Sequence, residues 1–95
     1  MSTQSIVELT KKAQKDIVTI PDYIKRKLLM WIDSVEAHGI YKIRKIPGFH
    51  DEPLKGNRLG QRSIRLSKSY RAIYSMGTKG VMEIISIEEV NKHEY

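Results

Sequence analysis

The chain has 95 residues, no cysteine, a formal net charge of +6 and a sequence pI of about 9.7. This composition excludes a disulfide framework and a thiolate metal site, and the longest apolar run, Leu28 to Ile32, is too short to span a membrane. The first residues also lack the basic-then-apolar pattern of a signal peptide. We therefore expect a single domain over residues 1–95, with no membrane segment, in the cytoplasm.

The first half of the chain predicts one strand and two helices. Residues 5–9 have strand character, and Thr10 suits a helix N-cap. A helix is expected from Lys11 to about Thr19 and a longer one from Pro21 to about His38, ended by Gly39. Each has an apolar stripe at helical spacing, formed by Leu9, Ala13, Ile17 and Ile20 in the first and by Ile24, Leu28, Trp31/Ile32 and Val35 in the second.

Residues 40–60 contain two prolines and three glycines, so regular structure is not expected past Ile46. A loop of this length in a small domain is often functional. Residues 42–79 carry ten basic side chains against two acidic ones, so the positive charge is concentrated there. Clustered cations of this kind predict an anionic partner.

Residues 61–75 alternate with the period of a β-hairpin around a turn at 67–69. Ile64 and Leu66 share one face of the first strand, and Tyr70, Ala72 and Tyr74 share one face of the second. Arg65 and Arg71 then emerge together on the opposite, exposed face. Because guanidinium groups match phosphate oxygens bidentately, this pair predicts a site for a nucleic-acid backbone.

A turn is expected at 76–80 and a last strand over 81–90. The order β-α-α-β-β-β predicts an α+β domain with two N-terminal helices packed on one face of a small, mostly antiparallel twisted sheet.

Three motifs in this order resemble the RelE/HigB superfamily of toxins from bacterial type II toxin–antitoxin modules. They are P-L-K-G-x-R at 53–58, S-I-R-x-x-x-x-Y-R-x-I-Y at 63–74 and the terminal H-x-Y at 93–95. The resemblance covers nearly the whole chain. It implies a RelE-like fold and a metal-independent, cofactor-free endoribonuclease that cuts mRNA in the ribosomal A site. It also implies a cognate antitoxin as partner, in a hetero-oligomer.

The same resemblance implies the site residues. Arg71 takes the position of the arginine that contacts the scissile phosphate, and Arg65 that of a basic residue on the preceding strand. His93 and Tyr95 fall in the segment that relatives use for proton transfer and base stacking, and His50 lies near a histidine of HigB-type members. Further cations are expected to contact RNA, namely Arg44, Lys45, Lys55, Arg58, Arg62 and Lys68.

Cleavage by 2′-OH attack needs one proton removed, one proton delivered and the phosphorane charge neutralised. Histidine can transfer protons near neutral pH, which suits His93, and arginine stabilises charge. The group that opposes His93 stays open between His50 and Glu94. Two other functions remain as alternatives: a ParE-like inhibitor of DNA gyrase, and a non-catalytic module that binds RNA or the ribosome.

Overall fold

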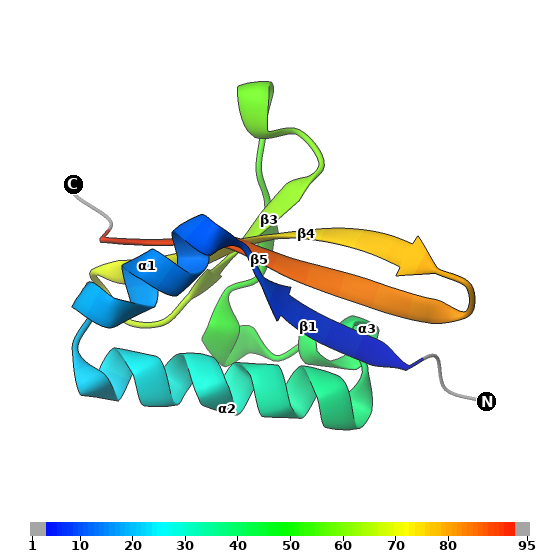
Figure 1. Cartoon of the computed structure of the whole chain (residues 1–95), viewed down its shortest axis with the longest axis horizontal. Coiled ribbons are helices and arrows are strands. Elements are labelled where there is room, and N and C mark those ends of the chain that lie inside the picture. Colours follow the sequence, from blue (N-terminus) through cyan, green and yellow to red (C-terminus); the bar gives the residue numbers. More distant parts are fainter. Residues whose placement is uncertain (1–3, 93–95) are drawn as a thin grey trace.

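The computed structural model describes residues 4–92 and contains a five-stranded sheet in the order β1-β5-β4-β3-β2 (Figure 1). All neighbouring strands are antiparallel except β1 and β5, which are parallel. The predicted α+β fold with a mostly antiparallel sheet is confirmed. The elements are β1 Ser5–Leu9, α1 Lys11–Thr19, α2 Asp22–His38, α3 Ile40–Ile43, β2 Glu52–Pro53, β3 Gln61–Arg65, β4 Tyr70–Lys79 and β5 Met82–Lys92, with 3-10 helices at Pro47–Phe49 and Gly56–Arg58.

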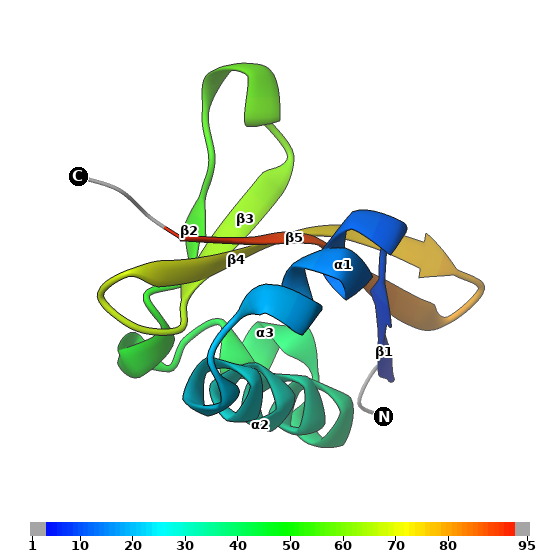
Figure 2. The ribbon, with the colours of Figure 1, turned by 60° about the vertical axis from the view of Figure 1, so that its left-hand side comes forward.

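The long helix α2 lies across one face of the sheet, with α3 beside it, whereas the segment around Gly56–Arg58 projects on the other side (Figures 1 and 2). The helix begins at Asp22, one residue later than predicted, because Pro21 occupies the N-cap position. It ends at Gly39, where φ is 88° and the backbone N–H donates to the carbonyl of Val35 at 2.7 Å. No helix among the described residues is long and apolar enough to cross a membrane.

The shorter helix α1 lies along β5 and covers the part of that strand which β1 leaves unpaired. The β1–β5 ladder stops at the Leu9–Ile87 pair. Beyond it, the Thr10 hydroxyl donates to the carbonyl of Glu88 at 2.7 Å, and Asp16 Oδ2 accepts from the N–H of Val90 at 3.0 Å. Thr10 also caps α1 as predicted, since Oγ1 accepts from the N–H of Ala13. Thr10 and α1 therefore provide hydrogen-bond partners for backbone groups of β5 that have no neighbouring strand.

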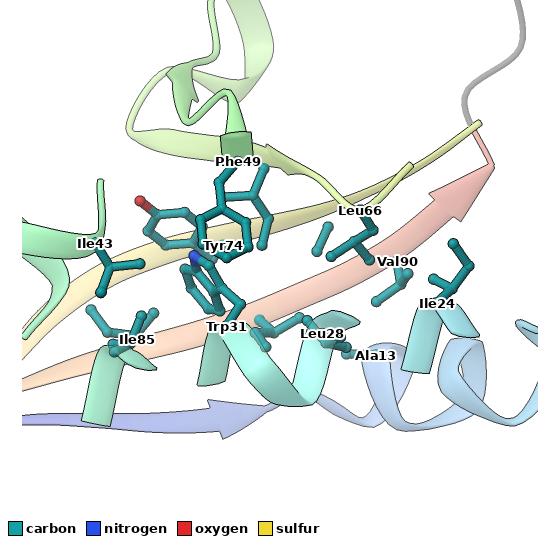
Figure 3. Packing of buried hydrophobic residues seen from close by; sticks show 14 of the residues in the cluster. Ala13, Ile24, Leu28, Trp31, Ile43, Phe49, Leu66, Tyr74, Ile85 and Val90 are labelled. Carbon is teal, nitrogen blue, oxygen red and sulfur yellow. The ribbon is translucent and has the colours of Figure 1, made fainter. Parts of the chain in front are cut away.

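One hydrophobic core joins the helices to the sheet, and its centre is the contact between Trp31 of α2 and Tyr74 of β4 (Figure 3). Their ring centroids are 5.2 Å apart at an interplanar angle of 49°, a tilted arrangement that aromatic pairs favour. The predicted stripes meet here. The buried members include Ala13, Ile20, Ile24, Leu28, Trp31, Val35, Ile64, Leu66, Ala72 and Tyr74.

Two sequence predictions about the strands were wrong. The turn expected at 76–80 is part of a longer β4, which pairs with β5 up to Lys79 and Met82, and Gly80 supplies the positive φ of 63° at the actual turn. The loop after Ile46 contains the two-residue strand β2, in which Glu52 pairs with Ser63 and Pro53 with Arg62. So short a strand has no periodicity to reveal it, and it adds a fifth strand to the predicted four.

Candidate functional site

The predicted arginine pair, Arg65 and Arg71, exists in the structure. The two residues are direct register partners across β3 and β4, so both side chains leave the sheet on the same face, away from α2. Arg65 is exposed and Arg71 is partly buried. Within residues 4–92 neither guanidinium has a salt bridge or a side-chain hydrogen bond. Like charges directly opposite each other are unfavourable, so an anion bound between them would be stabilised.

The arginine pair lies at the end of the hairpin that carries one other predicted residue, Lys68. Lys68 is exposed in the turn that joins β3 to β4. On the neighbouring strand, Arg71 pairs with Asn91 and Tyr70 pairs with Lys92, the last described residue. The predicted residues His93 and Tyr95 follow Lys92 in the sequence and lie outside the described residues, as does Glu94.

Four other predicted residues lie outside the β3–β4 hairpin. His50 is exposed at the C-terminal end of the Pro47–Phe49 turn, in the left-handed region with φ 47°. Lys55 is exposed ahead of the Gly56–Arg58 turn. Arg44 and Lys45 follow α3, which packs beside α2 on the opposite side of the sheet (Figure 2), so the fold does not bring them to the arginine pair.

Arg62 points to the α2 side of the sheet and not to the face of the arginine pair. It is the register partner of the core residue Tyr74, and it shares the parity of buried Ile64. Its Nε donates to Asp51 Oδ1 at 2.6 Å. The period-2 alternation that placed Arg65 correctly already assigns Arg62 to the other face. Arg62 therefore serves an internal ion pair, contrary to the expectation that it would face RNA.

Asp51, which the sequence did not single out, is the centre of this internal network. Its side chain is fully buried and also accepts a hydrogen bond from the Tyr74 hydroxyl at Oδ2. Burial would lower the pKa of Arg62, but the hydrogen bond and negative charge of Asp51 outweigh it and raise that pKa. Burial, and then the hydrogen bond to Asp51, raise the pKa of Tyr74 well above its ordinary value. Asp51 thus ties the 47–60 segment to the sheet.

The raised pKa of Tyr74 makes stability sensitive to alkali. The folded chain holds the phenol proton more tightly than the unfolded chain, whose pKa is near the ordinary 10.0. The protonated Tyr74 phenol therefore contributes its full stabilisation at pH values below the pKa of the unfolded chain, and the stabilisation decreases as the pH rises above that pKa. Above about pH 10, we expect the unfolding free energy to fall by about 1.4 kcal/mol per pH unit more than in Tyr74→Phe, measured by urea unfolding. Equal slopes for the two proteins would contradict the assignment.

A polar hollow of about 530 Å³ opens over the strands, lined by side chains from α1, the 56–61 segment and β5. We call this the polar hollow, and its lining residues are Lys12, Asn57, Arg58, Gln61, Glu88 and Glu89. Sequence patterns did not indicate it, because its walls come from three distant segments. Among residues 4–92 no group of three or more histidine or acidic side chains is arranged to hold a metal ion.

No protein-family model matches the sequence, and no curated protein matches it either. Solved structures do match. YafQ from E. coli strain BL21(DE3) has a TM-score of 0.75 at 17% identity, over 95% of this chain and 94% of that one. The YoeB/ParE toxin from Agrobacterium tumefaciens has a TM-score of 0.70 at 18% identity, over 94% and 99%.

A third match is the archaeal RelE–RelB complex from Pyrococcus horikoshii OT3, with a TM-score of 0.67 at 24% identity over 96% of both chains. YafQ also appears in the E. coli DinJ–YafQ toxin–antitoxin complex, with a TM-score of 0.69 at 20% identity. At these identities the likeness concerns the fold, and it extends over nearly the full length of each chain. The protein therefore has the RelE-like fold shared by the YafQ, YoeB and RelE structures of toxin–antitoxin modules.

Proposed function

We propose that the protein is the toxin of a toxin–antitoxin module and acts in the cytoplasm as a metal-independent endoribonuclease on ribosome-bound mRNA. The observation that carries the proposal is the arginine pair: two arginines that are direct register partners on the face of a RelE-like sheet away from α2, without a salt bridge to an acidic side chain within residues 4–92. Such a pair fits the two non-bridging oxygens of a phosphodiester.

In this proposal the 2′-oxygen attacks the adjacent phosphorus and the bond from phosphorus to the 5′-oxygen breaks. One group takes the 2′-OH proton and another gives a proton to the departing 5′-oxygen. The products are a 2′,3′-cyclic phosphate and a 5′-OH. Arg71, held by its neighbours on β3 and β5, meets the extra charge on the phosphorane and Arg65 assists it.

His93 supplies one of the two proton transfers and Tyr95 stacks on or orients a nucleotide. His50 and Glu94 are the two candidates for the other transfer. Lys68, at the same end of the hairpin as the arginine pair, and Lys55 hold the RNA backbone.

The proposed partner is a cognate antitoxin with an acidic segment that covers the arginine pair. The charge of +6 favours such a partner, and the similar YafQ and RelE structures include complexes with DinJ and RelB. Binding of this kind would form a toxin–antitoxin hetero-oligomer and block the site.

The test is to induce the protein in bacteria and map the 5′ ends of mRNA. We expect growth arrest and new 5′-OH ends inside codons, which co-expression of the antitoxin suppresses. His93→Ala should lower the cleavage rate by about 10²- to 10⁴-fold. The matched control is His38→Ala, because His38 is exposed at the end of α2, on the other side of the sheet.

The alternatives predict different results. A halt in DNA synthesis with intact mRNA would indicate a ParE-like toxin. Arrested translation without new 5′ ends would indicate a non-catalytic module that binds the ribosome.

A further inference from the structure

The polar hollow lies next to the arginine pair on the same face of the sheet. Arg65, Arg71 and Asn91 are aligned across β3, β4 and β5, and two residues further along the row continues with Ser63, Ile73 and Glu89. Two residues of a strand span about 7 Å. The hollow therefore begins about 7 Å from the place where a phosphate would bind, a distance that one nucleotide can span.

A β-bulge gives the hollow its two carboxylates. Ile73 pairs with Glu89 and the following residue, Tyr74, pairs with Ile87, so Glu88 is an extra residue in β5. Consecutive strand residues normally point to opposite faces, but here both glutamates line the hollow. Bulges occur next to functional sites because they redirect a side chain in this way.

The contacts around the hollow pair both of its cations with carboxylates and leave no excess of positive charge. Glu89 is nearly buried and forms a salt bridge with Arg58 through one oxygen, while the other oxygen is 3.9 Å from Lys12 Nζ. Glu88 Oε1 accepts a hydrogen bond from Ser75 at 2.6 Å. Lys12 Nζ is also 3.0 Å from Asp16 Oδ1, so two cations stand against three carboxylates around the hollow. A phosphate entering the hollow would meet these carboxylates, whereas an uncharged polar group would not be repelled.

Several hydrogen-bonding atoms remain available for such a group. Gln61 Oε1 accepts from Arg58 Nη1 at 3.2 Å, and within residues 4–92 the two N–H donors of its amide have no hydrogen-bond partner. Within residues 4–92, Glu88 Oε2 has no hydrogen-bond partner and the Asn57 amide has none either. The hollow therefore presents a carboxylate acceptor beside amide donors.

We propose that the polar hollow binds a base of the RNA next to the phosphate held by the arginine pair; this proposal rests on the proposed function and names how its substrate is read. Single-stranded RNA is read through the edges of unstacked bases. The Glu88 carboxylate accepts from an exocyclic amino group, and the Gln61 amide donates to a ring or carbonyl acceptor. Guanine offers two adjacent N–H groups to one carboxylate and fits best, whereas uracil has no amino group and fits worst.

The proposal gives Arg58 a different role from the phosphate contact that the sequence predicts. Its guanidinium forms a salt bridge with Glu89 and a hydrogen bond with Gln61, and so holds these two side chains in the wall of the hollow. The salt dependence of RNA binding separates the two roles, because each phosphate contact contributes about −0.7 to the logarithmic slope for a single strand. Arg58→Gln should leave the slope unchanged, whereas Arg71→Gln should reduce its magnitude by about 0.7.

The experiment uses the full chain and four 2′-O-methyl trinucleotides that differ only in one base, since these bind but cannot be cut. Fluorescence anisotropy should show about tenfold tighter binding of the guanine trinucleotide than of the uracil one. In Glu88→Gln this preference should fall below about twofold, with uracil binding little changed. Asp33→Asn makes the same change in charge on the exposed surface of α2 and should keep the preference.

Amide chemical shifts add a second measurement. Inorganic phosphate should shift the amides around Arg65 and Arg71, and the guanine trinucleotide should in addition shift those at 57–61 and 88–89. Asn57→Ala provides a second variant in an exposed position, should Glu88→Gln fail to fold.

Equal affinity for the four trinucleotides, or an unchanged guanine preference in both variants, would overturn the base site. The proposed function would still stand if induced cells show new 5′-OH ends. Absence of both trinucleotide binding and mRNA cleavage would overturn the two together.

Discussion

Arg71→Ala is expected to abolish growth arrest and to lower the rate of mRNA cleavage by about 10²- to 10³-fold, the usual effect of removing one donor to a developing anion. Arg71 is partly buried in the central strand β4, between Arg65 on β3 and Asn91 on β5. Its position is therefore held by the sheet, whereas Arg65 is exposed and less constrained. The measurement is the rate at which induced cells accumulate new 5′-OH ends.

Two further variants sharpen this test. Arg71→Lys keeps the charge but loses the planar fork, so it should recover only part of the activity. Lys79→Ala removes an exposed cation at the far end of the same strand and should cleave like the parent protein. If Arg71→Ala cleaved at the rate of Lys79→Ala, the arginine pair would not be the site that stabilises the phosphorane.

Asp51→Ala is expected to lower the unfolding free energy by about 3 kcal/mol, because it leaves the Arg62 guanidinium and the Tyr74 hydroxyl without their partner. Arg62 keeps some access to water, which holds the loss at the lower end of the range for broken buried ion pairs. For a domain of this size the melting temperature should fall by about 12 °C or more. Thermal unfolding followed by circular dichroism measures it.

The neighbouring carboxylate gives the control, since Glu52 is exposed and Glu52→Ala should shift stability by less than about 0.5 kcal/mol. Tyr74→Phe removes one hydrogen bond and keeps the ion pair, so a loss of about 1 kcal/mol is expected. Equal melting temperatures for the Asp51→Ala and Glu52→Ala proteins would show that the internal network contributes nothing to stability.

The elements that sequence patterns predicted best are those with a strong period of their own. The stripe Ile24, Leu28, Trp31 and Val35 repeats with the helical period, and all four residues are buried. The hairpin alternation placed Arg65 and Arg71 on one exposed face, and the structure confirms them as register partners. Both predictions depend only on the order of apolar and polar residues along one element. The fixed period of a helix or a strand then determines on which face of that element each side chain lies.

Arg62 was expected to contact RNA, but the same alternation places it on the face of Tyr74, because it is two residues from Ile64 on β3. The prediction for the 40–60 segment failed for another reason. β2 has only two residues, Glu52 and Pro53, and it exists because β3 lies beside it. Asp51 likewise has no recognisable pattern, and its importance comes entirely from Arg62 and Tyr74, which are 11 and 23 residues away.

The sequence by itself determined the α+β class, the helical faces and the basic hairpin, since each depends on local period and composition. Only the tertiary structure decided that Asp51 is an internal anchor and that Lys12, Arg58 and Glu89 meet at one site. These features depend on strand register and on the bulge at Glu88, where long-range pairing overrides the local pattern.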